Sequence, residues 1–558
     1  MRAVLLYLML LLVLSCGKEE QQPVPLPSVP DPVSITSAKI NGTDTDRFRY
    51  LLTNQATIAI QFSKPVKQNT IGPAITLTRD NNNTTDFTTT ISDGGKLLTL
   101  HAAHLDYLTQ YNVNISGSIE AQDGGKLSSP IAKSFATGID SSRKFPPLTD
   151  DQLLDRVQQT TFKYFWDFAH PVSGLIREGS KHADNIVTTG GSGFGLMSIV
   201  VAMERGFISR DQGLERVEQT VDFLAHKAQK FHGAFSHWLD GTTGAVIPFS
   251  QYDDGADIVE TSLLVQGLLC VRQYFNRPDV AEVTLRNDIN TIAKGVEWNW
   301  FQQNQQDVLY WHWSANYGWA MNIKIEGWNE GLITYVLAAS SKNYAISKSV
   351  YDNGWARSGA IKNGRTFMGM ELPLGPDYGG PLFFEHYSFL GINPIGLSDG
   401  YANYQTQSKN HSLINYNFCK SNPNHYYGYS DSVWGLTASN IKGGYTASSP
   451  SNDQGFIAPT AALSSMPFTP DESMAALKFF YYVLGDKIFR EYGFTDAFSL
   501  DIEKNKAPWY ADNFLAINQG PIIVMIENFR TGLLWNLFTS CPEVKAGMKK
   551  LGFSAPYL

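Results

Sequence analysis

A change of sequence texture at Pro146-Pro147 most constrains how this chain can fold. Before it, in residues 34–138, short runs such as Thr57-Ile58-Ala59-Ile60-Gln61-Phe62 alternate small or apolar residues with polar ones. Turn signals such as Asp93-Gly94-Gly95 separate these runs. Alternation with a period of two is typical of half-buried strands, and many short strands with turns between them favour two packed sheets. Residues 34–138 are therefore predicted to form a small all-β sandwich.

From residue 147 to residue 558 the apolar spacing becomes helical, and residues 139–146 are read as a linker. Helices are expected in segments 149–168, 195–204, 212–229, 257–274, 329–339, 471–484 and 521–537. Long loops rich in Gly, Asn and aromatic residues lie between them. No repeat of fixed length is visible, which argues against an open solenoid. A closed toroid of paired helices, with a pocket formed by loops at one end, fits better, and the loops are where function is expected.

The N-terminus has the pattern of an export signal. Arg2 precedes the apolar run 3–14, which is too short to span a bilayer, so residues 1–15 are predicted to be a signal peptide. The run ends in Val13-Leu14-Ser15-Cys16, which resembles a bacterial lipobox and predicts that Cys16 carries lipid.

The residues after Cys16 extend this prediction. Residues 16–33 contain closely spaced prolines and are expected to form an extended tether. Gly17-Lys18-Glu19-Glu20 is similar to a signal for export of lipoproteins to the cell surface. The chain is therefore expected to be lipid-anchored to the outer membrane, facing either the periplasm or the cell exterior.

Composition narrows the class of partner. Of the 558 residues 43% are hydrophobic and the net charge is -8, with no run of Lys or Arg. This balance describes a globular protein and argues against nucleic acid as a partner. Beyond Cys16 the chain has Cys270, Cys419 and Cys541, whose spacing indicates neither a disulfide framework nor a zinc site. We expect a monomer that needs no cofactor.

The segment Tyr252-Asp253-Asp254-Gly255-Ala256-Asp257-Ile258-Val259-Glu260 holds four carboxylates directly before an apolar helical run. Asp257 and Glu260 are three residues apart, on one face of the first helical turn. Neighbouring like charges raise a carboxyl pKa, whereas a helix N-terminus favours the ionised form. The segment could also be only a helix cap and a turn. A calcium site is the less favoured alternative, because the spacing differs from that of the Asp-x-Asp-x-Asp-Gly loop, so no metal is expected.

Several later segments combine aromatic and polar residues in a way that a core does not need. They are Tyr164-Phe165-Trp166-Asp167, Arg177-Glu178, Gly233-Ala234-Phe235-Ser236-His237-Trp238, Glu326-Gly327-Trp328-Asn329-Glu330-Gly331, Phe384-Glu385-His386-Tyr387, Ser430-Asp431-Ser432-Val433-Trp434-Gly435, Gly455-Phe456-Ile457-Ala458-Pro459, Ile517-Asn518-Gln519-Gly520-Pro521 and Met525-Ile526-Glu527-Asn528.

Together these segments resemble glycoside hydrolase family 144, the bacterial glucoamylase-like β-1,2-glucanases, over residues 147–558. The resemblance implies a mainly α protein, an (α/α)6 barrel that hydrolyses β-1,2-glucan or β-1,2-glucooligosaccharides with inversion and needs no cofactor. Some members of the family act within the chain, and others release sophorose from an end. The preceding residues resemble a bacterial Ig-like module, with Phe62-Ser63-Lys64-Pro65-Val66 as its most typical piece, and a spacer is favoured there over a glycan binder.

The resemblance points to Asp253, Asp257 and Glu330 as the acidic site residues. An inverting hydrolase needs a protonated carboxyl and a water-activating carboxylate about 6.5–9.5 Å apart, which two different helices supply more readily than one helical turn. Glu330 is therefore expected to be the acid. Asp257 is favoured as the base, with Asp253 sharing or replacing that role, and Glu260 is expected to accept sugar hydroxyls.

Further residues of these segments are expected to bind the sugar: Trp166, Arg177, Tyr252, Trp328, Asn329, His386, Trp434 and Gln519. Related proteins can carry Asp where this chain has Asn518, so a base is not expected there. Residues 439–452 could block one end of the cleft, which leaves endo against exo action open. Two alternatives remain, a surface lipoprotein that binds glycan without cleaving it and a hydrolase of the same fold that acts on another β-glucan.

Overall fold

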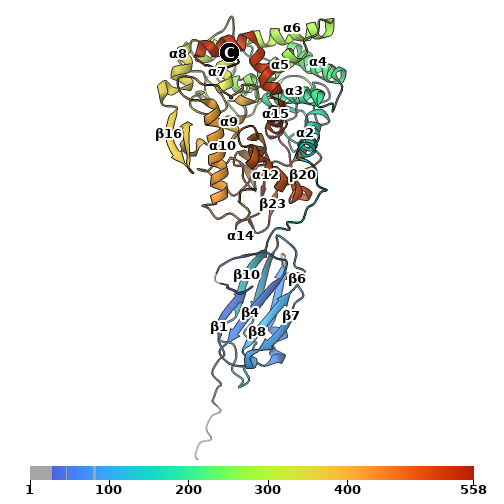
Figure 1. Cartoon of the computed structure of the whole chain (residues 1–558), viewed down its shortest axis with the longest axis vertical. Helices are drawn as coiled ribbons and strands as arrows, with labels where there is room; N and C mark the ends of the chain where they lie inside the picture. The colour runs from blue at the N-terminus through green and yellow to red at the C-terminus, as the bar shows by residue number, and fades with distance from the viewer. Residues whose placement is uncertain (1–27, 46, 80–82) are drawn as a thin grey trace, which may run out of the picture. The chain divides into compact units, whose positions relative to one another are not determined.

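The computed structural model describes residues 28–45, 47–79 and 83–558 and divides the chain into two compact units, Met1–Gly138 and Ile139–Leu558 (Figure 1). The predicted signal peptide, the predicted lipidation site Cys16 and most of the predicted tether lie outside the described residues. Among the helices of the described part, none is both long enough and apolar enough to cross a membrane.

The first unit consists of two five-stranded sheets that share one apolar core. One sheet has the order β2 (Thr43–Asp44), β1 (Ile35–Ile40), β4 (Ala56–Phe62), β8 (Leu97–Ala102), β7 (Thr88–Ser92). The other has the order β3 (Tyr50–Leu51), β10 (Ile131–Thr137), β9 (Gln110–Ile115), β5 (Ile75–Arg79), β6 (Asn83–Thr84).

Alternation along the strands builds this sandwich, as the sequence predicts. In β4 the side chains of Ala56, Ile58, Ile60 and Phe62 are buried, whereas Thr57, between the first two, is exposed. All strand pairs in the two sheets are antiparallel except β3 with β10. The short helix α1 (Ile71–Ala74) leads into β5.

Residues 139–146 do not behave as the free linker that the sequence suggests. The Lys144 N–H donates to the carbonyl of Tyr482 at 2.7 Å. The ring of Phe145 packs on Tyr481, with ring centroids 4.8 Å apart. These contacts make the segment part of the helical unit.

The second unit is built from helices of two kinds (Figure 1). Some are buried over most of their surface: α3 (Thr189–Glu204), α5 (Ile258–Tyr274), α7 (Leu332–Ser340), α11 (Pro459–Ser464) and α15 (Ala516–Thr531). Others bury one face and expose the other: α2 (Asp150–Trp166), α4 (Arg210–His226), α6 (Val280–Gly295), α10 (Tyr404–Ser421), α12 (Pro470–Tyr482), α16 (Leu533–Ser540) and α17 (Pro542–Leu551). Helix α3 packs between α5 and α15, and α2, α12, α16 and α17 cover buried helices from outside.

Glycines let α3 and α5 approach each other closely. A Cβ on Gly193 would lie 2.2 Å from the carbonyl oxygen of Leu263, and one on Gly267 would lie 2.2 Å from the carbonyl oxygen of Gly193. Because any larger residue would push the two backbones apart, these glycines set the spacing of the helices that carry the site.

Helix ends follow local signals that the sequence contains. Capping boxes start α2 at Thr149 and α4 at Ser209. The single helix predicted over residues 521–537 is wrong, because the chain turns at Gly532, whose φ is 69°, and α16 follows α15 as a separate helix.

Short strand pairs lie ahead of the buried helices and gather the loops. They are β11 (Ile186–Thr188) with β12 (Trp238–Asp240) and β13 (Val246–Ile247), β14 (Ala256–Asp257) with β15 (His312–Trp313), and β18 (Ala438–Ile441) with β19 (Gly444–Ala447). Strand β11 runs directly into α3, and β14 runs directly into α5.

The remaining elements are short strand pairs and short helices in the segments between the main helices. Paired strands are β16 (Lys362–Phe367) with β17 (Met370–Leu374), β20 (Phe489–Arg490) with β21 (Gly493–Phe494), and β22 (Phe498–Ser499) with β23 (Trp509–Tyr510). Short helices are α8 (Lys348–Val350), α9 (Phe383–His386), α13 (Gly485–Ile488) and α14 (Ile502–Asn505).

Candidate active site

Asp257 caps the N-terminus of α5 and is almost fully enclosed. Its Oδ1 accepts hydrogen bonds from the backbone N–H groups of Val259 and Glu260, both at 2.9 Å. Its Oδ2 lies 3.5 Å from Nδ1 of His237 and 3.4 Å from Nε2 of His312. Burial would raise the pKa of Asp257, but the two imidazoles hold it well below its usual value. Asp257 is therefore held in the ionised form, with Oδ1 hydrogen-bonded to the backbone and Oδ2 facing the two imidazoles.

Asp253 has a different environment, four residues earlier. Only 4% of its surface is exposed, and within the described part of the chain its Oδ1 has no hydrogen-bond partner. Its Oδ2 lies 3.5 Å from Nε2 of His312. Burial and the charge of Asp257 raise the pKa of Asp253 to about 6. Asp253 thus offers a free carboxylate oxygen at neutral pH.

Glu260 and Glu330 come from different helices and face each other's charge. Glu260 lies in the first turn of α5, and its Oε2 accepts the N–H of Gly190 from the first turn of α3 at 2.7 Å. Glu330 precedes Gly331, the N-cap of α7. Burial raises the pKa of Glu260 to about 7, and the charges of Asp257 and Glu178 contribute to this shift. Burial likewise raises the pKa of Glu330 to about 7, aided by the charges of Glu260 and Asp257.

The backbone around Glu330 is fixed from behind. The hydroxyl of Ser388 donates to the Glu330 carbonyl at 2.5 Å and accepts from the N–H of Ile333 at 3.0 Å. Asn329 stabilises the same turn, because its Oδ1 accepts the N–H of Gly331 at 2.8 Å. The predicted sugar contact of Asn329 is therefore corrected to a turn-forming role.

Two residues that the sequence analysis passed over complete this pocket. Glu178 is buried, its Oε2 lacks a partner among the described residues, and its charge acts on Glu260 and His237. Tyr387 is also buried with an unpartnered hydroxyl, and the charges of Glu330 and Glu260 act on it. Unpaired polar atoms at this density are typical of a site that waits for polar ligand groups.

The hairpin of β18 and β19 brings a third such residue, Tyr445. Its side chain is 51% exposed, yet its hydroxyl is enclosed well enough for burial to raise its pKa, and the charges of Asp496, Glu178 and Glu330 add to this. The hairpin is anchored by Asp496, whose Oδ2 accepts the backbone N–H of Asn440 at 2.6 Å and its side-chain amide at 2.7 Å.

Asn518 completes this anchor. Its amide donates to Asp496 Oδ1 at 2.6 Å and to the carbonyl of Ala438 at 3.1 Å. An Asp at this position could make neither bond when ionised, so Asn518 holds the hairpin in place.

Four of the residues predicted to contact sugar have buried side chains with partners of their own, although Oε1 of Gln519 has none among the described residues. His386 contacts the Ser465 hydroxyl at 3.0 Å, and the indole N–H of Trp434 donates to the carbonyl of Glu472 at 3.2 Å. The Gln519 amide donates to the carbonyl of Phe494 at 2.8 Å. Trp328 is enclosed by aromatic rings and by Gly375.

Two further predictions also fail, for a related reason. The guanidinium of Arg177 donates to the carbonyls of Phe168, Ala169 and Asp184, so it staples backbone. Trp166 is covered by the Arg216 guanidinium, which lies 4.3 Å from its ring centroid. Beside Arg177 and His386, a neighbour in the sequence, Glu178 and Tyr387 respectively, faces the site instead.

Tyr252 keeps the exposure that a sugar contact requires. It is 42% exposed and meets the exposed ring of Tyr317 edge to face, with ring centroids 5.2 Å apart. The carboxylate of Asp254, next along the chain from Asp253, accepts the Asn316 amide at 2.7 Å and joins the same two loops.

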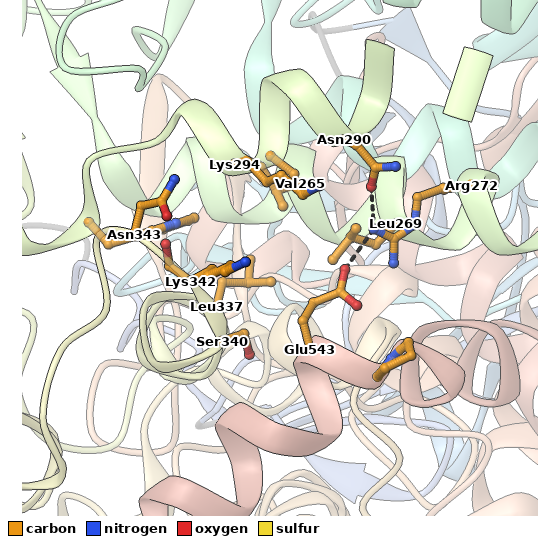
Figure 2. Close-up of a pocket in the computed structure, with 14 residues that line it drawn as sticks. Val265, Leu269, Arg272, Asn290, Lys294, Leu337, Ser340, Lys342, Asn343 and Glu543 are labelled. Atoms are coloured by element: carbon orange, nitrogen blue, oxygen red, sulfur yellow. Dashed lines mark hydrogen bonds and ion pairs between the residues drawn. The ribbon is translucent and has the colours of Figure 1, made fainter. Parts of the chain in front are cut away.

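The carboxylates are remote from a cavity of about 340 Å³ that Figure 2 shows. This cavity has an apolar floor that includes Leu269 and Leu337, and the ion pair of Arg272 with Glu543 closes one side at 2.6 Å. Arg272 lies in the last turn of α5 and Asp257 at its start, which separates them by about 22 Å along the helix axis. The cavity is therefore not part of the site.

A helical unit in which helix starts and the loops before them gather five buried or partly buried carboxylates belongs to the class of carboxylate-based carbohydrate-active domains. The comparisons with known proteins agree with this class. The family model described as "Putative glucoamylase" matches residues 322–542, and that of the bacterial Ig-like domain matches residues 35–137.

Three relatives define the family more closely. An exo β-1,2-glucooligosaccharide sophorohydrolase (non-reducing end) of Parabacteroides distasonis is 45% identical over 426 residues, or 73% of this chain and 58% of the relative. The solved endo-β-1,2-glucanase of Chitinophaga pinensis, in complex with sophorotriose and glucose, is 52% identical over 74% of this chain and 100% of that one, with a TM-score of 0.71. The solved β-1,2-glucanase of Parabacteroides distasonis is 36% identical over 94% of this chain and 73% of that one, with a TM-score of 0.70.

The chain belongs to this glucoamylase-like family of β-1,2-glucanases and sophorohydrolases, as the resemblance to glycoside hydrolase family 144 predicts, and it carries an N-terminal Ig-like domain. It spans 58% of the length of the sophorohydrolase that it matches.

Proposed function

We propose that this protein hydrolyses β-1,2-linked glucan or β-1,2-glucooligosaccharides by an inverting mechanism with two carboxyl groups. The observation that carries the proposal is the state of Glu330, whose pKa is raised to about 7 beside the carboxylates of α5. A carboxyl group with this pKa is still largely protonated just below neutral pH and can give a proton to a leaving glycosidic oxygen. The relatives' names supply the linkage.

In this mechanism Glu330 is the general acid and Asp253 is the base. The free Oδ1 of Asp253 and its pKa of about 6 suit a group that accepts a proton from water near neutral pH. Asp257, which the sequence favours as base, has Oδ1 engaged by two backbone N–H groups and a pKa held well below its usual value, which makes it a weak proton acceptor near neutral pH. Its role here is to cap α5 and to hold His237 and His312 beside Asp253.

The other polar groups of the pocket are proposed to hold the sugar. Glu260, Glu178 and the hydroxyl of Tyr387 present acceptors or donors beside the acid, and Tyr252 offers an apolar face at the mouth. The helices are inferred to close as the (α/α)6 barrel of the family. Support comes from the alternation of buried helices with one-sided helices and from the packing of α3 between α5 and α15.

The hairpin of β18 and β19 is proposed to form a wall at one end of the cleft and so to favour release of short products from chain ends. Tyr445 of β19, whose pKa is raised by burial and by the charges of Asp496, Glu178 and Glu330, is proposed to stand at that end of the cleft. A ladder of products from a long linear glucan would refute this wall, whereas a single disaccharide would support it.

Hydrolysis is tested by incubating the purified chain with β-1,2-glucan and with short β-1,2-glucooligosaccharides, and by counting new reducing ends. β-1,3-, β-1,4- and β-1,6-glucans serve as controls for linkage. Reducing ends from the β-1,2 substrates alone are expected. Binding without reducing ends would identify a glycan-binding lipoprotein instead, and release from another glucan would change the linkage.

Export and lipidation are a separate proposal that rests on Cys16 and the residues before it. The protein is proposed to be anchored to the outer membrane by lipid on Cys16. In cells fed a labelled fatty acid, the wild-type chain should carry label and Cys16→Ala should not. Label on both would refute lipidation at this residue.

A further inference from the structure

Four side chains with metal-ligating atoms meet beside the strand pair β14–β15. Pairing of Asp257 with His312 brings the two strands into register, and His237 and Asp253 close the group from the neighbouring loops. His237 Nδ1 lies 3.5 Å from Asp257 Oδ2, and His312 Nε2 lies 3.5 Å from Asp253 Oδ2 and 3.4 Å from Asp257 Oδ2. Ligand atoms of His237, Asp253 and Asp257 all lie within 4.8 Å of one another.

These gaps are wider than direct hydrogen bonds, which have nitrogen–oxygen distances of about 2.7–3.2 Å. The His232 Nδ1 to Glu297 Oε2 distance in the same chain is 2.8 Å, so a His–carboxylate pair can close fully here when nothing prevents it. A tetrahedral zinc ion with bonds of about 2.1 Å holds its ligand atoms about 3.4 Å apart. The three separations above are close to that spacing, and the ligand atoms of His237, Asp253 and Asp257 lie within 4.8 Å of one another, so the side chains would have to close around an ion.

A second observation points to a ligand. Asp253 Oδ1 has no hydrogen-bond partner among the described residues, although Asp253 is only 4% exposed. Buried polar atoms are almost always paired, so a carboxylate left open here calls for a partner that the protein chain does not supply. A cation bound by both oxygens of Asp253 would satisfy Oδ1 directly.

The donor set identifies the class of metal. Two imidazole nitrogens with two carboxylate oxygens suit Zn²⁺ and similar first-row ions, whereas Ca²⁺ and Mg²⁺ prefer oxygen ligands alone. The side chain of His237 is 20% exposed, and the other three are at most 9% exposed, so an ion would enter past His237.

We propose that His237, His312, Asp253 and Asp257 bind Zn²⁺ and that bound zinc blocks hydrolysis by occupying Asp253. The binding half stands on the cluster alone. The blocking half rests on the proposed function, in which Asp253 activates water. Zinc would then act as a reversible inhibitor that binds on the base side of the site and leaves Glu330 untouched.

Binding is tested by titrating ZnCl₂ into the metal-free full-length chain in a calorimeter, with the variants His237→Gln and His312→Gln. We expect one ion per chain in the wild type and a loss of affinity of at least about tenfold in each variant, as for loss of a metal contact. His232→Gln, which removes a His–carboxylate contact outside the cluster, is the matched control and should bind zinc like the wild type. Equal affinity in all four proteins would overturn the site.

If a variant does not fold, the site is tested on the wild-type protein instead. Anomalous diffraction at the zinc edge from wild-type crystals soaked in zinc should give a peak among the four ligand atoms. A peak elsewhere, or none, would overturn the proposal. Calcium chloride at the same concentration is the control ion and should not compete.

Blocking is tested by hydrolysis of β-1,2-glucan with increasing zinc. Activity of the wild type and of His232→Gln should fall in parallel with occupancy and return when EDTA removes the metal. Full activity, or activation, at saturating zinc would overturn the blocking half. Lack of hydrolysis by the metal-free chain would instead refute the proposed function and leave the binding result to stand or fall by calorimetry.

Discussion

Glu330 and Asp253 differ from the other acids of this site in what surrounds their carboxyl groups. Glu330 is raised to a pKa of about 7 by burial and by neighbouring acids, and Asp253 to about 6 by burial and Asp257. Asp257, by contrast, is held in the ionised form by two imidazoles and two backbone N–H donors. Groups whose environments separate their pKa values in this way mark acid and base assignments.

Substitution of Glu330 by Gln tests the acid. Glu330→Gln should lower turnover on the order of a thousandfold, because the amide cannot give a proton to the leaving oxygen. Its melting temperature and its affinity for oligosaccharide should stay near those of the wild type. Glu326→Gln, an exposed acid four residues earlier, is the control and should keep full turnover. Near-normal turnover in Glu330→Gln would remove this residue from the acid role.

The pH dependence follows from the same two groups. The base works when Asp253 is ionised, so kcat/KM should fall as pH drops through about 6. The acid works when Glu330 is protonated, so kcat/KM should fall as pH rises through about 7. A narrow bell centred between these values is expected from rates measured across pH 4 to 9 on the metal-free chain, to about one pH unit. A flat profile through neutral pH would contradict the assignments.

Stability should respond to pH through Glu330 as well. A carboxyl whose pKa is higher in the folded than in the unfolded state binds more protons when folded, so the free energy of unfolding falls as pH rises. For Glu330 this loss runs from its unfolded pKa, 4.5, up to about 7. The urea-unfolding free energy of Glu330→Gln should therefore fall less steeply than that of the wild type over this interval. Parallel curves would show that the pKa of Glu330 is not raised.

The sequence located this chemistry more accurately than it located the sugar contacts. The resemblance to the family names Asp253, Asp257 and Glu330, and the readable start of α5 places Asp257 and Glu260 on one helical turn, whereas Asp253 lies in the loop before β14. Sugar contacts depend on which way a loop side chain turns, and sequence spacing does not fix that direction.

The neighbours Arg177 and Glu178 illustrate this limit. Both are polar and both lie in a loop. The Arg177 guanidinium donates to three backbone carbonyls, whereas Oε2 of Glu178 has no donor among the described residues. The sequence signal at this loop is a glycine directly after the carboxylate, at Gly179. In the structure a Cβ there would lie 3.0 Å from the carbonyl of Phe514, so the loop is tightly packed. His386 and Tyr387 show the same limit, because the predicted sugar contact His386 is engaged by Ser465, whereas the hydroxyl of Tyr387 is unpartnered among the described residues.

Among the elements, the hairpin of β18 and β19 has the most direct effect on substrate choice. Tyr445→Phe removes one hydroxyl near Glu330 and should lower kcat/KM on β-1,2-glucooligosaccharides by about tenfold, the value of one hydrogen bond of about 1.4 kcal/mol. The melting temperature should not change. Tyr107→Phe, an exposed tyrosine of the sandwich unit, is the control. Unchanged kinetics in Tyr445→Phe would remove its hydroxyl from the site.

The crossing of α3 and α5 is the element that holds both halves of the site together. Gly193→Ala should lower the free energy of unfolding by about 3 kcal/mol, because its Cβ meets the backbone of Leu263. Gly400→Ala, where a Cβ meets nothing within 4 Å, is the control and should be close to neutral. Urea unfolding of both variants measures the difference. A neutral Gly193→Ala would mean that the two helices can move apart.

At the scale of the whole molecule, the chain joins a β-sandwich to a helical unit of the β-1,2-glucanase family. The sequence predicts that the first unit is all-β and the second mainly α, because apolar residues recur with a period of two in one and of about 3.6 in the other. The packing of residues 139–146 on the helical unit was not predictable, since it depends on contacts between distant segments, whereas the break between α15 and α16 follows a local signal, Gly532, that the prediction did not use.

The central claim, that an acid and a base on separate helices cleave a β-1,2 bond with inversion, is tested most directly by following the first product by proton NMR. Fresh enzyme is added to β-1,2-glucan, and the new reducing end is observed before it equilibrates. The account predicts that the α-anomer forms first and then converts to the equilibrium mixture. Initial formation of the β-anomer would contradict the inverting pair, and the absence of any new reducing end would contradict hydrolysis itself.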